Sequence, residues 1–76
     1  MIDVRLFANL AFSANGRQAE FRVNARPGLT VQDVADQEGI ASGEVQMILV
    51  NGRRARLDTF LADGDRLGLF PAVGGG

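Results

Sequence analysis

The sequence predicts an α+β domain in which a mixed sheet of about five strands packs against one helix. Short stretches at 1–7, 19–23 and 66–70 alternate polar with apolar residues, which is the period of half-buried strands. One stretch, 30–39, carries apolar residues at helical spacing between a capping residue and a glycine. A chain of 76 residues forms one domain and buries only about 60% of its unfolded surface, so no deep catalytic cleft is expected.

The first two strands are predicted to form a hairpin. Residues 1–7 place aliphatic side chains toward the core and Phe7, with charged residues, on the opposite side. The alternation resumes at 19–23 with the same two-residue period. The Asn15-Gly16 pair between them is a strong turn signal, although the connection is too long for a tight two-residue turn.

The stretch 30–39 is predicted to be a helix of about two to three turns that packs on the sheet. The Thr30 hydroxyl can cap the first amide groups, and Asp33 suits the first turn. Gly39 supplies the stop. The core-facing stripe consists of Val31, Val34 and Ala35.

The third strand, 45–50, is apolar on both faces. The Asn51-Gly52 pair that follows is the strongest short hairpin signal in the chain and leads into a brief return strand at 53–55. In the loop at 57–65, three apolar residues are predicted to plug the edge of the core: Leu57, Phe60 and Leu61.

The last strand, 66–70, is predicted to face the core with Leu67 and Leu69. Its other side carries Gly68 and Phe70, and Pro71 ends it. The helix is then the natural crossover between strands that need not be antiparallel neighbours.

The composition excludes most familiar catalytic sites. The chain has no cysteine and no histidine, so it lacks a disulfide framework, the usual zinc ligands, a thiol nucleophile and an imidazole base. The net charge of −1 gives no basic field for nucleic acid. The apolar runs are far shorter than the roughly 20 residues of a membrane helix, and no signal-peptide core is seen. We expect a cytoplasmic protein without membrane or nucleic-acid partners, and no cofactor or metal bound by the isolated chain.

All eight basic residues are arginines, so no side chain can accept an isopeptide bond. Three of them, Arg53, Arg54 and Arg56, cluster after the Asn51-Gly52 turn. This cluster is interpreted as a solvated hairpin face, with docking of an acidic partner surface as the alternative.

The chain combines this order of elements with "VNGR" followed by "LADGDRLGLFP" and with the glycines at 74–76. In these features the chain resembles the MoaD/ThiS-type β-grasp sulfur carriers. These ubiquitin-like proteins include the small subunit of molybdopterin synthase and the thiamine-pathway carrier. The resemblance covers essentially the whole chain, and the Phe70-Pro71 exit into the glycines is closest to the molybdopterin branch. That branch usually has Arg-Glu where this sequence has Ala11-Phe12, which leaves the pathway open. The implied organisation is a β-grasp domain, 1–71, with a flexible glycine-rich tail, 72–76.

The resemblance implies a role for the tail. In the family, an adenylyltransferase of the ubiquitin-activating type uses ATP to activate the terminal carboxylate, here that of Gly76. A sulfur donor then displaces AMP and leaves a thiocarboxylate. Gly74 and Gly75 would thread a narrow channel that leaves no room for a Cβ, and Pro71 and Val73 would contact the partner. The large subunit of molybdopterin synthase would supply the catalytic side chains, which makes this chain a non-catalytic carrier.

A docking surface is predicted beside the tail. Two phenylalanines, Phe7 and Phe70, occupy outward strand positions that normally favour polar groups. Similarity to ubiquitin-like folds favours Ile48 and Val50 inward, with the intervening residues outward. The predicted surface consists of Phe7, Met47, Leu49, Gly68 and Phe70. The alternative for Phe7 is a position under a neighbouring loop.

Two other functions remain open from the sequence. A ubiquitin-like modifier would be joined through the same terminus to lysines of target proteins. An interaction domain would carry a tail that is incidental, since terminal glycines are often disordered ends. Among sulfur carriers, thiamine synthesis, transfer-RNA thiolation and tungsten-cofactor synthesis are alternatives to the molybdopterin pathway.

Overall fold

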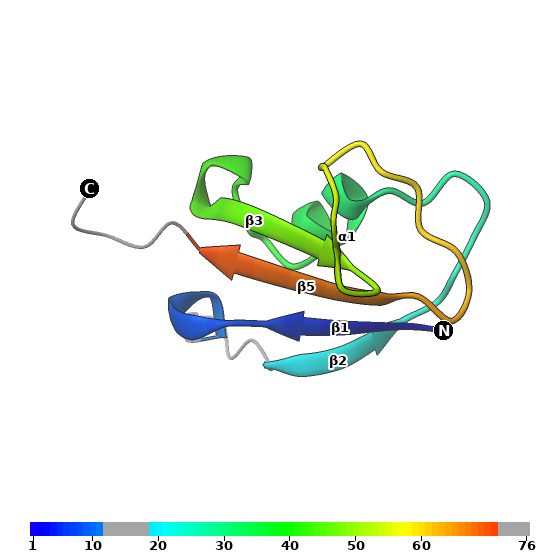
Figure 1. The fold of residues 1–76 in the computed structure, drawn as a ribbon, viewed down its shortest axis with the longest axis horizontal. Coiled ribbons are helices and arrows are strands. Elements are labelled where there is room, and N and C mark those ends of the chain that lie inside the picture. The colour runs from blue at the N-terminus through cyan, green and yellow to red at the C-terminus, as the bar shows by residue number, and fades with distance from the viewer. Residues whose placement is uncertain (12–18, 72–76) are drawn as a thin grey trace.

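The first and last strands of the described chain lie side by side in the centre of one sheet (Figure 1). The computed structural model describes residues 1–11 and 19–71. Their sheet has the order β2-β1-β5-β3-β4, with β1 parallel to β5 and the other neighbours antiparallel. The strands are β1 (Ile2–Leu6), β2 (Glu20–Val23), β3 (Val45–Val50), β4 (Arg53–Arg54) and β5 (Arg66–Pro71). The predicted mixed sheet is confirmed, and β5 runs one residue further than predicted because it includes Pro71.

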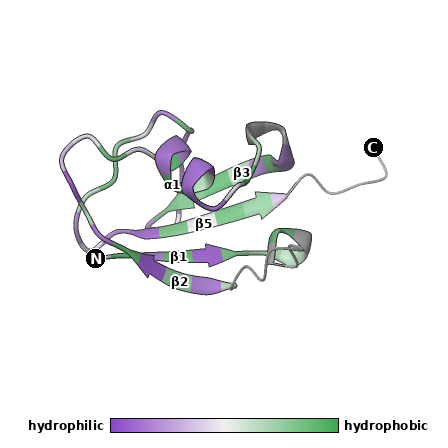
Figure 2. Ribbon diagram, turned by 180° about the vertical axis from the view of Figure 1, so that it is seen from behind, coloured by the Kyte–Doolittle hydropathy of each residue, from purple (hydrophilic) through white to green (hydrophobic). Residues whose placement is uncertain are grey.

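The helical elements are α1 (Val31–Gln37) and two 3-10 turns, η1 (Ala8–Ala11) and η2 (Ser42–Glu44). Figure 2, seen from the other side, shows α1 in front of the sheet. The helix therefore covers one face, and we call the opposite face the outer face. Among the described residues, no helix is long and apolar enough to cross a membrane.

The β1–β2 hairpin is confirmed, with Val4 opposite Phe21. Its connection begins with η1, which the sequence did not predict. The rest of the connection, including Asn15 and Gly16, lies outside the described residues. Residues 72–76 lie outside them too, so the domain boundary at residue 71 stays a prediction.

The predicted helix forms with its predicted cap. The Asp33 backbone N–H donates to the Thr30 hydroxyl (3.2 Å), and the Thr30 N–H donates to the Asp33 carboxylate (3.0 Å). This reciprocal pair is a capping box, which satisfies two amide groups that the helix leaves unpaired. Gly39 has a φ of 72°, the left-handed conformation that suits the residue after a helix end. The side chains on the predicted stripe are fully buried.

Loss of the cap is expected to weaken the fold measurably. Thr30→Ala removes the hydroxyl that accepts from the Asp33 N–H and should lower the free energy of unfolding by about 1 kcal/mol. Thr30→Ser keeps the hydroxyl and is the matched control. Urea unfolding of both variants checks this, and equal losses for Ala and Ser would contradict the capping role.

The capping box also predicts a pH dependence. The pKa of Asp33 lies below its usual value, mainly because the Thr30 backbone N–H donates to the carboxylate. The Thr30 side chain and the nearby Arg26 guanidinium lower this pKa further. A lowered folded-state pKa contributes stability that is present above the usual pKa and is lost as pH falls through the lowered one. Asp33→Asn can still accept the hydrogen bond but cannot titrate. Thermal melts should show a steeper acid loss below about pH 4 for the native chain than for Asp33→Asn, and parallel profiles would contradict this.

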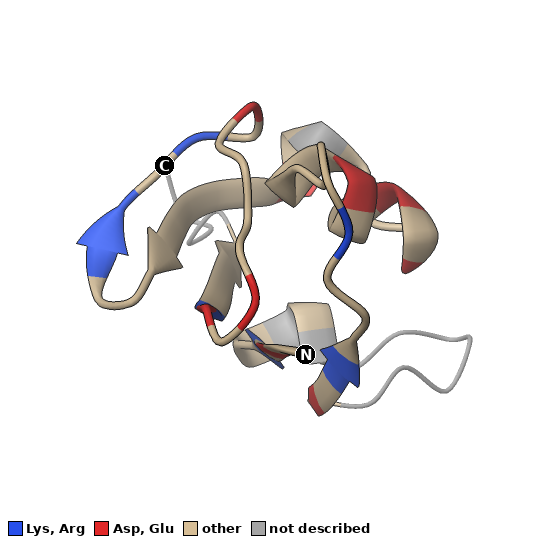
Figure 3. Cartoon of the chain, turned by 90° about the vertical axis from the view of Figure 1, so that its right-hand side faces the viewer, with Lys and Arg blue, Asp and Glu red and all other residues tan. Residues whose placement is uncertain are grey.

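The Asn51-Gly52 turn between β3 and β4 forms as predicted. Both residues have positive φ, 54° and 81°, as a tight hairpin turn requires. The Asn51 side-chain amide donates to Asp65 (2.9 Å), and its oxygen accepts from the Arg66 N–H (2.9 Å). These bonds fix the hairpin turn to the start of β5. Figure 3 shows the short β4 arrow formed by arginines, which are exposed.

In the loop between β4 and β5, the prediction that Phe60 plugs the core is wrong. Leu61 is buried and Leu57 packs against the core, as predicted. Phe60 instead is 71% exposed. The Leu61 N–H donates to the Leu29 carbonyl (2.8 Å), and Phe60 bridges Thr30. Neighbouring residues of an extended segment point in opposite directions, so burying Leu61 turns Phe60 outward.

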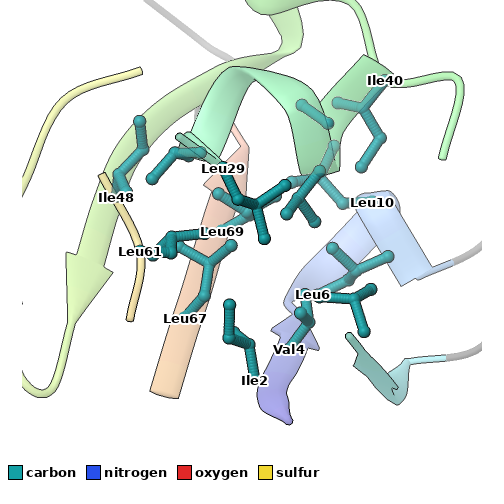
Figure 4. Close-up of a cluster of buried hydrophobic side chains, with 14 residues drawn as sticks. Ile2, Val4, Leu6, Leu10, Leu29, Ile40, Ile48, Leu61, Leu67 and Leu69 are labelled. Carbon is teal, nitrogen blue, oxygen red and sulfur yellow. The ribbon is translucent and has the colours of Figure 1, made fainter. Parts of the chain in front are cut away.

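The core lies between the sheet and α1 (Figure 4). Leu67 and Leu69 of β5 meet the aliphatic residues of β1 and the stripe of the helix. Ile48 is buried, and Val50 packs against the same cluster, as predicted. The inward positions of β1, β3 and β5 are therefore fixed, and this determines which side chains face the opposite way.

Candidate functional site

The outer face carries the predicted apolar patch, which consists of Phe7, Met47, Leu49, Gly68 and Phe70. Cross-strand pairing brings these residues together: Met47 lies opposite Phe70, and Leu49 lies opposite Gly68. Each is partly exposed. The Phe7 N–H donates to the Leu69 carbonyl (3.1 Å), so Phe7 continues the β1–β5 ladder beyond β1.

Phe7 and Phe70 stack on each other. Their ring centroids are 4.1 Å apart, and the ring planes differ by 6°. A parallel pair at this separation holds both rings in one orientation. The contact with Phe70 explains the outward position of Phe7 without a covering loop, which was the alternative.

Gly68 provides the space in which the rings lie. A Cβ at this position would be 3.4 Å from the Phe7 ring and 3.5 Å from the Phe70 ring. These are ordinary contact distances, so an alanine fits there, whereas a branched side chain would push the rings away. The glycine thus leaves room for the edges of both rings at the centre of the patch.

Two hollows of the outer face meet at the ring pair. One, of about 600 Å³, extends over β1, β2 and β5, and the other, of about 620 Å³, extends toward β3 and β4. Phe7 and Phe70 line both. Gly68 and Leu49 line the first, and Met47 lines the second. A partner side chain could enter beside the rings from either direction.

The patch lies at the end of the sheet from which the tail departs. Phe70 is followed at once by Pro71, which is partly buried and pairs with Val45. Val73 and Gly74–Gly76 lie outside the described residues, so their roles stay predictions. Three residues, 71–73, separate Phe70 from Gly74, so a partner that covers the ring pair would lie close to the glycines along the chain.

Arg5 and Ala8 border the patch and were not singled out from the sequence. The Arg5 guanidinium carbon is 6.0 Å from the Phe7 ring centroid, at the outer limit of a cation–π contact. The two-residue period could have indicated Arg5, because it shares the side of Phe7. Ala8 has a φ of 51°, which turns the chain sharply after Phe7, and nothing in "FANL" signals it.

No described group of acidic side chains could hold a metal ion within 1–11 and 19–71. The arginines at 53, 54 and 56 are exposed. Arg54 lies opposite Leu49 and lines the hollow toward β3 and β4, so it borders the patch.

A family model described as the ThiS family matches residues 4–76. The chain belongs to the ThiS family. Its β-grasp, ubiquitin-like fold is shared with solved structures that match it over nearly their whole length. A comparison with curated proteins gives no match.

Three of these structures bear on this ThiS-family chain. SAMP1 from Haloferax volcanii is 31% identical, with a TM-score of 0.72 over 99% of this chain and 98% of that one. A putative molybdopterin converting factor subunit 1 from Pyrococcus furiosus is 28% identical, with a TM-score of 0.72 over 95% and 97%. A complex of subunits 1 and 2 of the molybdopterin-converting factor from Helicobacter pylori 26695 matches at 25% identity, with a TM-score of 0.60 over 99% and 97%.

Proposed function

We propose that this chain is a sulfur carrier in molybdopterin biosynthesis, the small subunit of a molybdopterin synthase. The carboxylate of Gly76 attacks the α-phosphate of ATP, so that pyrophosphate leaves and an acyl-adenylate forms. Hydrosulfide, or a donor of sulfur at the same oxidation level, then attacks the acyl carbon, so that AMP leaves and a thiocarboxylate forms. The observation that carries this proposal is the family match, which continues through Gly74–Gly76. The likeness to molybdopterin-converting factor subunits supports the pathway.

The composition supports the assignment of sulfur to the main chain. Without cysteine or histidine, the protein has no thiol to hold sulfur and no imidazole to catalyse its transfer. We assign the atom to the C-terminal carboxylate, because the family match continues to Gly76, and the catalytic side chains come from partners. One partner is an adenylyltransferase of the ubiquitin-activating type that uses ATP, and the other is a large subunit that receives the sulfur. In the H. pylori structure, subunits 1 and 2 form a complex.

The apolar patch supplies the docking surface for these partners in turn. Because the apolar patch lies beside the glycine-rich tail, a partner that binds the patch also positions the tail. Burial of the ring pair supplies binding energy, and the tail is held within reach of the partner's reacting groups. The same surface would serve both partners, so activation and sulfur delivery alternate.

The proposal is tested by the intact mass of an N-terminally tagged chain purified from its own cells. The expected species is heavier than the carboxylate form by the difference between sulfur and oxygen. Iodoacetamide should alkylate it, because a thiocarboxylate is nucleophilic and a carboxylate is not. A single, unalkylated carboxylate species from cells that make molybdopterin would contradict the proposal.

The pathway is tested genetically. Cells without the gene should lose molybdoenzyme activity and grow without added thiamine. The native gene should restore activity, and the gene lacking the Gly76 codon should not. A thiamine requirement, or loss of thiolated transfer RNA with intact molybdoenzymes, would reassign the carrier to that pathway.

A ubiquitin-like modifier is the second candidate, favoured by the likeness to small archaeal modifier protein 1. It would be joined through Gly76 to lysines of other proteins, and since it has no lysine it could not form isopeptide chains of itself. Immunoblots of the tagged chain from denatured cells would show bands of high mass that are missing for the Gly76 deletion. Absence of such bands, together with the thiocarboxylate, would favour the carrier alone.

A further inference from the structure

The edge of β2 presents regularly spaced hydrogen-bonding groups. The Leu6 N–H donates to the Ala19 carbonyl (2.7 Å). Because hydrogen-bonded pairs in an antiparallel ladder recur at every second residue, Ala19 and Phe21 direct their N–H and C=O groups to β1. Glu20 and Arg22 direct theirs the opposite way. Since β2 is the end strand of the described sheet (Figure 1), these groups point to the edge with which no described strand pairs.

The side chains of the same two residues carry opposite charges on the outer face. Arg22 lies opposite Asp3, with Nε 3.0 Å from the carboxylate, and Asp3 lies opposite Arg66. One row across the sheet therefore reads Arg66, Asp3, Arg22, with alternating sign. In the next row, Glu20 lies opposite Arg5, and the two side chains form an ion pair.

We propose that a second copy of this chain pairs with β2 in antiparallel orientation, about a two-fold axis at Phe21. In this register, Glu20 of each copy lies opposite Arg22 of the other. Both members of such a pair direct their backbone groups to the shared edge, so each pair exchanges two hydrogen bonds. The two Phe21 side chains face each other between these pairs, at the spacing where cross-strand aromatics interact.

Charge selects this register. A two-fold axis at Arg22 would place the two Arg22 side chains opposite each other, and an axis at Glu20 would do the same with two glutamates. Like charges directly opposite are destabilising. An axis between residues would place an inward side chain opposite an outward one, which the alternation of β2 excludes. An axis at Val23 would place Arg22 opposite Asn24, beyond the end of β2. Within β2, the Phe21 register is therefore the one that places opposite charges together and keeps each side chain on its own face.

The pairing also extends the charge rows without a break. The row Arg66, Asp3, Arg22 continues into Glu20 and then Arg5 of the second copy, so the sign alternates along its whole length. The apolar patch lies on β5, on β3 and at Phe7 just beyond β1, and it stays open in both copies. Because the copies run in opposite directions, their tails leave from opposite ends of one continuous sheet.

The self-association is expected to be weak, because the shared edge is short. Sedimentation equilibrium of the full chain at increasing concentration should show a monomer–dimer equilibrium. In amide NMR spectra of the same series, the signals of Glu20 and Arg22 should move with concentration. A chain that stays monomeric at millimolar concentration, or concentration-dependent shifts centred on Phe7 and Phe70, would overturn the proposal.

Two charge reversals give a sharper test. Glu20→Arg places arginines opposite each other in both pairs, and Arg22→Glu places glutamates opposite each other. The association constant of each variant alone should be lower than that of the native chain by a factor of about ten or more. Mixed together, they pair arginine with glutamate at both positions, so the mixture should recover a dimer that holds one copy of each.

Arg53→Glu is the matched control, because it reverses one arginine on β4, at the other end of the sheet. It should leave the association constant unchanged, and thermal melts should show all three variants folded. Failure of the mixture to recover a dimer would overturn the register. Capture of an extended peptide from another protein along β2, without a dimer of the native chain, would overturn the choice of a second copy.

Discussion

Deletion of Gly76 is expected to abolish thiocarboxylate formation while the domain stays folded. The deletion retracts the carboxylate by one residue, about 3.3 to 3.6 Å in an extended chain. Reacting atoms must approach within about 3 to 3.5 Å, and a displacement of about 1 Å can cost 100-fold in rate, so the loss should exceed this factor. The measurement is the fraction of tagged chain that carries sulfur, by intact mass, in its own cells.

Two further tail variants separate length from shape. An alanine added after Gly76 moves the carboxylate outward and should block conversion as fully as the deletion. Gly75→Leu keeps the length but adds a side chain where the channel is proposed to admit only backbone. Gly43→Leu is the control, because a Cβ at Gly43 meets no atom within 4 Å. If the shortened or extended chain formed the thiocarboxylate as readily as the native chain, Gly76 would not be the residue that carries sulfur. The interaction-domain alternative would then be favoured.

Phe70→Asp is expected to reduce conversion severely with little loss of stability. Phe70 packs on Phe7 at the outer face, away from the core between the sheet and α1. In the bound state the new carboxylate would be buried without a partner, and a truncated interface anchor typically costs 2 kcal/mol or more, about 30-fold in affinity. Leu49→Asp places the same charge on β3 and should behave alike.

Phe60→Asp is the matched control for the patch. It makes the same substitution at a phenylalanine that is 71% exposed and not part of the patch. Its conversion should equal that of the native chain. Equal losses for Phe60→Asp and Phe70→Asp, or a Phe70→Asp chain that unfolds at the growth temperature, would contradict the docking role.

Local signals in the sequence predicted most elements because their causes are local. The Thr30 cap and the Asn51-Gly52 turn each depend on a few neighbouring residues, and alternation shows which side of a strand is buried. Alternation does not show which strands are neighbours. The contact between Phe7 and Phe70 depends on the register of β1 against β5, which are far apart in the chain. Their outward positions were therefore predictable, whereas their stacking was not.

The wrong prediction at Phe60 has the same origin. In "TFLAD", both Phe60 and Leu61 are apolar, and the sequence does not indicate which one is buried. The choice is made by the hydrogen bond from Leu61 to Leu29, which lies in a different part of the chain. The turn at Ala8 is a backbone feature of a residue type that rarely adopts positive φ, so composition gave no signal for it.

The central position of β5 has a consequence for protein synthesis. In the part of the chain that the structure describes, the strands made first, β1 and β2, and those made later, β3 and β4, join in the sheet only through β5. A nascent chain that has not yet released residues 66–71 from the ribosome therefore holds two hairpins that no described strand joins into one sheet. It also lacks Gly68 and Phe70, so the apolar patch that is proposed as the docking surface is incomplete. Partners that recognise this surface would therefore engage only chains whose residues 66–71 have left the ribosome, and products truncated before β5 would not compete for them.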